Sequence, residues 1–429
     1  MFGFANFLLL ALFAAAVFDL IFALARGGGL RGALHGLWNT PHLLFGQQLA
    51  EWRLQLGRIL FAAGLAAYEI SVVFCNSMAR QNWAWVQGVM SPVLEWLAFL
   101  CFGAKILFGT RYTWRELLAG GALYFIARWV YFNSQNIWWI GIVVAVLAAK
   151  DVPLRRPLQV YFASGCAAMA VVLALHFAGI VAPDLTSERM GALRGTYGYG
   201  HPNTFGGLVF GLVLAYALLR AQKVRWVDCL LVFAVGVFLL VGPASRSAAL
   251  CTLALAVGLV FCRLRAGHSV PRWWPGTCAG MVGLTAAVSY LLPLLVIKVG
   301  PWNNDIGPAW LAKPDSLLTC RISLTWMAYR LLDVKIAGQV FNWPTVDNSF
   351  AFALFQFGPV VAALLGILFA AALLGHAKQG RRVEVCCLFA MLAYAYMEVQ
   401  PFHLTTNPTA LLLCGAVFAQ TSAQWQKIE

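Results

Sequence analysis

Apolar stretches recur along the whole chain and are separated by short polar breaks. Because a helix needs about 20 mostly apolar residues to cross a membrane, stretches of this length predict transmembrane helices. We place these spans near residues 3–25, 58–77, 88–106, 115–132, 136–149, 157–182, 204–220, 226–243, 247–262, 277–297, 350–375, 383–399 and 405–420. The pattern therefore predicts an all-α integral membrane protein, a polytopic bundle of about 12–14 transmembrane helices that forms a single membrane domain over residues 1–429.

The charged residues support this class and predict an orientation. Charged residues make up only 11% of the chain, whereas a soluble domain carries about a quarter. Lys and Arg gather in alternate short loops, among them 150–156, 220–225 and 378–382, as they do in cytoplasmic loops. Orientation thus explains the net charge of +14, and nucleic-acid binding is not expected. The N-terminus is expected outside, the C-terminus inside, and loops 183–203 and 298–349 on the outer face.

The polar residues that look out of place in a membrane protein fall in these outer loops. The stretch 194-RGTYGYGHPN-203 combines Arg194 with tyrosines, His201 and Asn203, and its glycines predict a tight loop. Pro202 suits the first turn of the next helix, which His201 or Asn203 could cap. A capped helix start with interfacial tyrosines is the simpler explanation, but it accounts for only part of the cluster.

Further candidates follow in the second half of the chain. Arg246 sits in a very short outer break, where an arginine that reaches the headgroups is the favoured explanation when the residue is taken alone. In the large loop, the spacing of apolar residues over 316–334 predicts an amphipathic helix that carries Arg321. Asp347 and Asn348 stand before the next span, where helix capping is the ordinary role.

Glu398 is predicted to lie inside the outer end of an apolar helix, where an ionisable group is costly. It indicates either a functional site or a structural tie to an arginine of the outer face, and the two are equally favoured.

Several arginines beside carboxylates and a histidine suit an anionic substrate that the membrane presents. The guanidinium fork matches phosphate oxygens, and arginines would stabilise the charge that develops on a diphosphate leaving group. A nearby carboxylate or imidazole could deprotonate an attacking hydroxyl. The outer loops hold no paired acidic motif, and the 11 cysteines lie mostly in apolar runs without ligand spacing. Neither a metal nor another cofactor is therefore expected.

The ordered motifs resemble a known family. Arg194 followed by Gly-Tyr-Gly-His-Pro-Asn at 198–203 is similar to the signature of the Wzy / O-antigen polymerase–ligase superfamily, especially the polymerases of Gram-positive capsule and exopolysaccharide loci. Ser245-Arg246-Ser247 and Asp347-Asn348-Ser349 resemble two further elements of that family. Glu398 and Asn407 stand where it carries a late Glu and Asn. The resemblance covers roughly the second half of the chain.

The resemblance implies a GT-C-like glycosyltransferase in the bacterial cytoplasmic (inner) membrane, with its active site on the extracytoplasmic face. Such an enzyme joins undecaprenyl-diphosphate-linked oligosaccharide repeat units into a surface polysaccharide and releases undecaprenyl diphosphate. The implied diphosphate-binding residues are Arg194, Arg246, Arg321 and, as a less certain helper, Arg189. The implied catalytic residues are His201, as first choice, then Asp347 and Glu398. The implied substrate-binding residues are Tyr197, Tyr199, Asn203, Asn348 and Asn407.

Two alternatives stay open at this point. A ligase of the same superfamily would deliver the chain to another acceptor, and only the His-Pro-Asn form of the motif favours the polymerase. A flippase or transporter of lipid-linked oligosaccharides would place cations deep along a pathway, often between repeated halves, and no internal repeat is visible. The family also implies a chain-length regulator and a flippase as partners.

Overall fold

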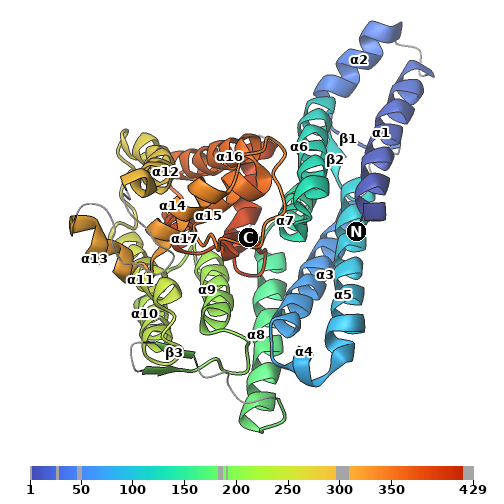
Figure 1. The fold of residues 1–429 in the computed structure, drawn as a ribbon. Helices are drawn as coiled ribbons and strands as arrows, with labels where there is room; N and C mark the ends of the chain where they lie inside the picture. Colours follow the sequence, from blue (N-terminus) through green and yellow to red (C-terminus); the bar gives the residue numbers. More distant parts are fainter. Residues whose placement is uncertain are drawn as a thin grey trace. The chain divides into compact units, whose positions relative to one another are not determined.

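A computed structural model describes residues 2–25, 29–45, 51–181, 187–189, 192–295 and 309–418. In this part of the chain, 8 helices are long and apolar enough to cross a membrane. They are α1 (Phe2–Ala25), α3 (Glu51–Cys75), α5 (Ser91–Phe108) with the preceding turn η1 (Val86–Met90), α8 (Arg155–Phe177), α9 (Pro202–Leu219), α11 (Arg246–Leu264), α12 (Trp274–Leu291) with η2 (Leu292–Leu295), and α16 (Pro359–Lys378). The chain is therefore an all-α, multi-pass membrane protein, as expected (Figure 1).

The remaining elements are shorter or less apolar. Those of the first half are α2 (Gly29–Asn39), α4 (Ala79–Asn82), α6 (Trp114–Ser134) and α7 (Ile137–Ala148). Those of the second half are α10 (Trp226–Val241), α13 (Ala309–Leu317), α14 (Arg321–Leu331), α15 (Ser349–Phe352), η3 (Ala353–Phe357), α17 (Arg382–Met397), η4 (Gln400–Phe402), η5 (Pro408–Leu413) and α18 (Cys414–Val417). The structure also has two antiparallel pairs of short strands. In one, β1 (His42–Leu43) pairs with β2 (Arg111–Tyr112), and in the other, β3 (Ser187–Arg189) pairs with β4 (Ala192–Arg194).

The chain divides into two compact units, which we describe separately. Unit 1 comprises residues 1–128, 140–208 and 410–429, and unit 2 comprises residues 129–139 and 209–409. The boundaries fall inside α6, α7, α9 and η5.

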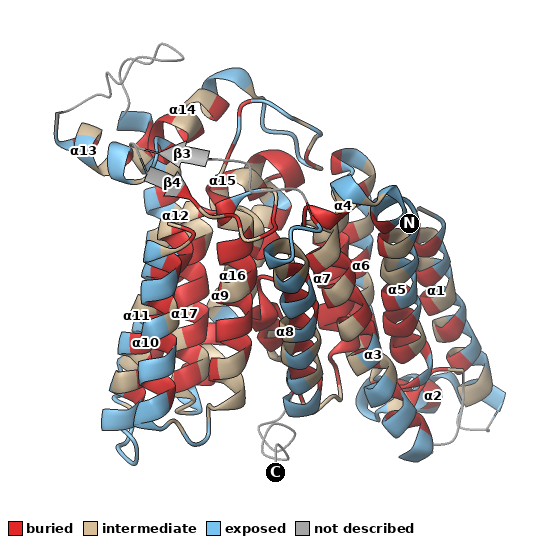
Figure 2. Cartoon of the chain, turned by 90° about the horizontal axis from the view of Figure 1, so that it is seen from below, coloured by how far each residue is buried: buried red, intermediate tan, exposed pale blue. Residues whose placement is uncertain are grey.

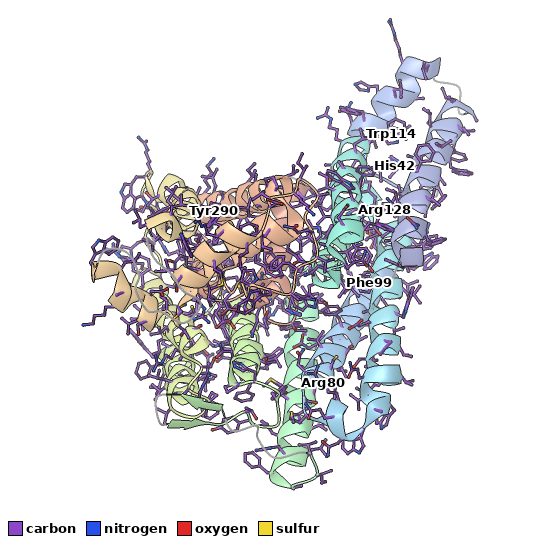
Figure 3. All side chains as sticks on the ribbon, in the orientation of Figure 1. His42, Arg80, Phe99, Trp114, Arg128 and Tyr290 are labelled. Atoms are coloured by element: carbon purple, nitrogen blue, oxygen red, sulfur yellow. The ribbon has the colours of Figure 1, made fainter. Side chains whose placement is uncertain are left out.

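In unit 1, helix α3 packs against α5 and α8. Glycine allows this close approach, because a Cβ on Gly57 of α3 would lie 2.8 Å from the carbonyl oxygen of Gly109. Helix α1 is held by Arg128 of α6, whose Nε donates to the side-chain oxygen of Asn6 at 2.8 Å. Phe99 of α5, which is labelled in Figure 3, packs edge-on against Phe4 of α1, with 5.5 Å between the ring centroids. Polar and aromatic contacts thus supplement the apolar packing.

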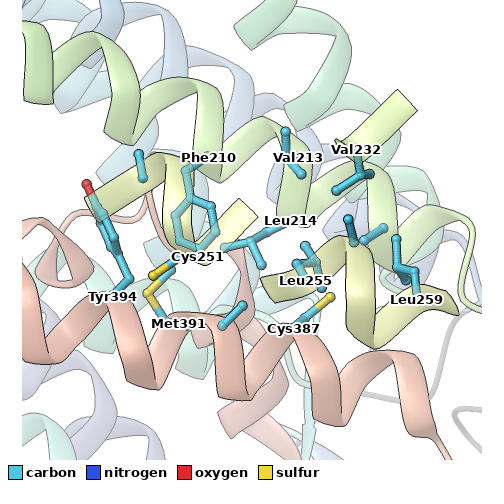
Figure 4. Packing of buried hydrophobic residues seen from close by; sticks show 14 of the residues in the cluster. Phe210, Val213, Leu214, Val232, Cys251, Leu255, Leu259, Cys387, Met391 and Tyr394 are labelled. Atoms are coloured by element: carbon cyan, nitrogen blue, oxygen red, sulfur yellow. The ribbon is translucent and has the colours of Figure 1, made fainter. Parts of the chain in front are cut away.

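In unit 2, the core lies between α10, α11, α17 and the later part of α9. Figure 4 shows Phe210 against Tyr394, whose ring centroids are 4.8 Å apart, beside Cys251 and Met391. Half of the residues of α17 are buried and nearly all the others are partly buried, whereas α10 exposes a row of apolar side chains (Figure 2). That difference fits a central helix and a lipid-facing one.

The structure corrects three expected elements. The helix expected over 316–334 is split into α13 and α14, because Thr319 and Cys320 take left-handed backbone angles, with φ of 62° and 61°. The span expected over 350–375 is broken at Gly358, which has a φ of 88°. The last span, expected over 405–420, is a shorter helical segment, Pro408–Val417, that begins as a 3-10 helix. The total of about 12–14 spans and the sidedness of the loops stay predictions.

Candidate functional site

The motif loop of unit 1 is built around the start of α9. Arg194 is buried, and its guanidinium donates to the side-chain oxygen of Asn203 at 2.9 Å. The backbone N–H of Asn203 in turn donates to Nδ1 of His201 at 3.1 Å. His201, one of the two caps that the sequence allowed, therefore caps the helix that begins at Pro202, and its side chain is exposed. The loop thus brings Arg194, His201 and Asn203 together.

Backbone hydrogen bonds fix this loop on the segment that follows α3. The N–H of Met78 donates to the carbonyl of Gly198 at 2.8 Å, and Ser77 forms an isolated bridge with Tyr199. Gly198 has a φ of 80°, and a Cβ there would lie 3.0 Å from the side chain of His176. Both its conformation and its surroundings therefore require glycine, which explains one of the glycines of the motif.

The two tyrosines of the loop differ in their surroundings. Tyr197 is partly exposed and stacks on Phe205 with 5.0 Å between the ring centroids. Tyr199 is completely buried, and burial together with the charge of Glu69 in α3 raises the pKa of its phenol. Tyr199 thus anchors the loop, and of the two only Tyr197 has a ring open to solvent. Glu69, itself 1% exposed, was missed by the sequence reasoning; the signal was a single carboxylate within an apolar helix.

Of the two arginine candidates of unit 2, Arg321 and Arg246, the first lies in a buried ion pair. Arg321 is the first residue of α14, and one terminal nitrogen of its guanidinium donates to Oε1 of Glu398 at 2.6 Å. The exposed fractions of the two side chains are 9% and 7%. The second terminal nitrogen donates to the carbonyl of Leu318 at 3.2 Å. Arg321 and Glu398 therefore form a buried, hydrogen-bonded ion pair.

A second carboxylate, Asp347, faces the same arginine. Its Oδ2 lies 3.7 Å from Nε of Arg321, and 32% of its side chain is exposed. The Nε of Arg321 is buried and makes no hydrogen bond within the described residues. The site therefore contains one sequestered carboxylate, one accessible carboxylate, and a buried N–H donor beside the accessible one.

Serines of α11 and α15 position the sequestered carboxylate. Ser247 donates to Oε1 of Glu398 at 2.8 Å, and Ser349 donates to its backbone carbonyl at 2.5 Å. Ser247 follows Arg246, which is the first residue of α11 and partly buried. The sequence reasoning had not assigned a role to either serine, although both stand inside the quoted motifs. Their contacts bring α11, α14, α15 and the end of α17 to one place within unit 2.

The two remaining asparagine candidates, Asn348 and Asn407, make hydrogen bonds to nearby backbone groups. Asn348 caps α15, because its side-chain oxygen accepts from the N–H groups of Phe350 and Ala351 at 2.9 and 3.1 Å. Asn407 donates to the carbonyl of Pro401 at 2.9 Å and so closes the turn after α17. Arg189 belongs to β3, but its side chain is outside the part of the chain that the structure describes.

Six of the candidates thus lie in unit 2 and five in the described part of unit 1. The unit 2 set is Arg246, Arg321, Asp347, Asn348, Glu398 and Asn407; the unit 1 set is Arg194, Tyr197, Tyr199, His201 and Asn203. Comparison of the chain with protein-family models, curated proteins and solved structures finds no match.

Proposed function

We propose that this chain is a membrane glycosyltransferase that polymerises lipid-diphosphate-linked oligosaccharide repeat units, of the kind carried by undecaprenyl diphosphate, into a surface polysaccharide. The observation that carries the proposal is the arrangement at Arg321: a buried guanidinium with an unused Nε donor beside the half-exposed carboxylate of Asp347. The positive charge of the guanidinium and its N–H donor can bind a phosphate oxygen, and the carboxylate can accept the proton of a hydroxyl.

In the proposed reaction, a hydroxyl oxygen of the acceptor sugar attacks the anomeric carbon of the donor. The bond between that carbon and the diphosphate oxygen breaks, and the lipid diphosphate leaves with the electron pair. The proton of the hydroxyl passes to a carboxylate. Arg321, with Arg246 of the same unit, stabilises the negative charge on the leaving diphosphate, which is the kind of electrostatic effect that contributes most to catalysis.

Access decides which carboxylate takes the proton. Asp347 has 32% of its side chain exposed, whereas Glu398 has 7% and already accepts hydrogen bonds from Arg321 and Ser247 at a single oxygen. We therefore assign the base to Asp347 and the positioning of Arg321 to Glu398. Among the sequence candidates this ranks Asp347 above Glu398. His201 and Arg194 belong to unit 1, and their order along the chain, as part of the motif, supports the proposal.

The test uses purified protein in vesicles supplied with lipid-linked repeat unit, with the products separated on a gel. We expect a ladder of polymer from the wild type and no ladder from Arg321→Ala, and turnover about 10²–10⁴-fold lower for Asp347→Asn. Arg330→Ala is the matched control, because Arg330 lies on the same helix α14 and is exposed. It should keep the ladder.

Other results would replace the proposal. Transfer of a finished chain to a different acceptor, without elongation, would indicate a ligase. Movement of the lipid-linked unit across the bilayer without any covalent product would indicate a transporter. A wild-type ladder that survives in Arg321→Ala and Asp347→Asn would keep the activity but contradict the site.

A further inference from the structure

Unit 2 contains a cluster of aromatic rings that the proposed chemistry does not use. It joins the start of α7 to the turn after α17. The rings of Trp138 and His403 lie 3.8 Å apart between centroids. Next to them, Trp139 stacks on Phe357 at 5.5 Å, and Phe357 meets Phe402 edge-on at 5.0 Å. The cluster is partly open, because Trp138 and His403 are each partly exposed.

Two nitrogens of this cluster have no hydrogen-bond partner within the described residues. They are Nε1 of Trp139, whose side chain is 1% exposed, and Nδ1 of His403. An indole N–H can only donate, and a buried polar group without a partner costs free energy. Native structures rarely leave such groups unpaired. Trp139 is linked through Phe357 to Phe402, the neighbour of His403 in the chain, so the two nitrogens belong to one cluster. Two such groups in one cluster indicate a place where a ligand supplies the missing hydrogen bonds.

The chemistry of the cluster selects a neutral, hydroxyl-bearing ligand. Burial lowers the pKa of His403 to about 3, so its imidazole is uncharged near neutral pH and does not attract phosphate. A purely apolar ligand, such as a lipid chain, would leave both nitrogens unpaired. A sugar ring offers apolar C–H faces to the aromatic rings and hydroxyls to the two nitrogens. It is the ligand class that satisfies both features.

The cluster is connected to the carboxylate–arginine site through η3 and the turn after α17. Phe357 ends η3, which continues α15, and α15 begins directly after the Asn348 cap. At about 1.5 Å per residue, the helical segment from Asn348 to Phe357 spans roughly 13 Å. The turn from Glu398 leads to His403 over a short stretch of chain. The separation suits one short oligosaccharide that reaches both places.

We propose that Trp138, Trp139 and His403 form a carbohydrate subsite that binds a neutral sugar ring of the substrate. The identity of that substrate as a lipid-linked oligosaccharide rests on the proposed function, but binding of the sugar can be measured without turnover. Trp138 supplies the exposed face, Trp139 donates from Nε1, and His403 pairs with a hydroxyl through Nδ1.

The test measures binding to the protein in nanodiscs by calorimetry with two probes. One is the oligosaccharide released from the lipid-linked repeat unit, and the other is undecaprenyl diphosphate without sugar. Trp139→Phe and His403→Phe keep a ring and remove a nitrogen, so each should weaken oligosaccharide binding about three- to tenfold. Both should bind the sugar-free lipid like the wild type. Trp273→Phe, at an exposed tryptophan of unit 2, is the matched control and should change neither.

The outcomes separate the subsite from the activity. If the wild type makes no polymer but binds the oligosaccharide, and the ring variants bind it less, the proposed function fails and the subsite stands. If the wild type makes polymer and Trp139→Phe and His403→Phe bind the oligosaccharide normally, the subsite is wrong. Equal weakening towards both probes would also overturn it, because the defect would not be specific to sugar.

Discussion

Replacing Arg321 with methionine should destabilise the protein more than replacing Glu398 with glutamine. The pair is buried and makes a hydrogen bond of 2.6 Å. Removing one partner of such a pair leaves an uncompensated buried charge, which typically costs about 3–5 kcal/mol. In Arg321→Met, the carboxylates of Glu398 and Asp347 both lose their cation. In Glu398→Gln, the guanidinium keeps Asp347 at 3.7 Å, so we expect a smaller loss, about 2–3 kcal/mol.

The double variant Arg321→Met/Glu398→Met tests the same reasoning from the other side. Replacing both members of a buried ion pair by apolar side chains of similar volume is often neutral. We therefore expect the double variant to recover most of the stability that Arg321→Met loses, so that its loss is far smaller than the sum of the two single losses. The double variant should make no polymer, because the arginine that we propose to bind phosphate is missing.

The assay is thermal unfolding of the detergent-solubilised protein, followed by fluorescence, beside the polymer ladder from vesicles. The expected order of stability is wild type, then the double variant, then Glu398→Gln, with Arg321→Met lowest. Losses that simply add in the double variant would refute the claim that the two charges compensate each other. A double variant that is both stable and active would show that the pair is a tie between helices and nothing more.

Three further predictions concern the framework of the site. A Cβ on Gly211 of α9 would lie 2.4 Å from the carbonyl oxygen of Thr405, so Gly211→Ala should lower the free energy of unfolding by about 1–3 kcal/mol, measured by thermal unfolding. The control is Gly366→Ala in α16, where a Cβ meets nothing within 4 Å. This variant should be neutral or slightly stabilising. Because burial lowers the pKa of His403 to about 3 from an ordinary 6.5, the unfolded state takes up its proton first. The free energy of unfolding should thus fall by up to about 1.4 kcal/mol per pH unit below about pH 6.5. His403→Phe should lessen this acid sensitivity, which melting curves at about pH 7 and pH 5 would measure. An equal loss of stability between the two pH values in both proteins would contradict the prediction. Asp315 is 0% exposed and its carboxylate caps α14, so Asp315→Ala should cost about 1–3 kcal/mol and speed proteolytic cleavage within α14, and unchanged cleavage would show that the cap is dispensable.

The membrane-spanning helices could be predicted from the sequence because lipid imposes a local rule. A chain in hydrocarbon must satisfy its own backbone hydrogen bonds, so length and apolarity identify a spanning helix without knowledge of its neighbours. Each expected span accordingly overlaps a helical segment of the structure. Residues 136–149 are one example: this run is short, yet α7 occupies Ile137–Ala148.

The breaks could not be predicted because they depend on side-chain and backbone contacts that apolar periodicity does not contain. Gly358 ends η3 where a Cβ would lie 2.1 Å from the carbonyl oxygen of Ile336, a contact that hydropathy does not encode. Asp315 begins the next helix, α14, by accepting the N–H of Ile322 at 2.7 Å from across a left-handed turn. The first feature arises from tertiary packing within unit 2, and the second is a local cap between residues seven positions apart.

The functional site, like the fold, could be predicted from the sequence only in part. The sequence singled out Arg321 in a predicted amphipathic helix and Glu398 in an apolar one, although 77 positions separate them. Ionisable residues in apolar surroundings are costly and therefore informative. The sequence could not tell that Glu398 is sequestered and Asp347 accessible. It also passed over Trp138 and Trp139, since aromatic residues near a membrane boundary are common. What distinguishes them is the orphaned Nε1 of Trp139 and the contact of Trp138 with His403.

Whether the Arg321–Glu398 pair is a tie or part of a site turns on the third charge. A tie between helices needs one cation and one anion, and burying them gains little over apolar packing. The second carboxylate, Asp347, adds nothing to such a tie: it stands 3.7 Å away, makes no hydrogen bond to the buried Nε, and keeps 32% of its side chain exposed. A phosphate oxygen at Nε would use the donor that the tie leaves idle, while Glu398 and Ser247 hold the guanidinium in place. The accessible carboxylate would remain open to the acceptor, whose hydroxyl must lose a proton as it attacks the anomeric carbon.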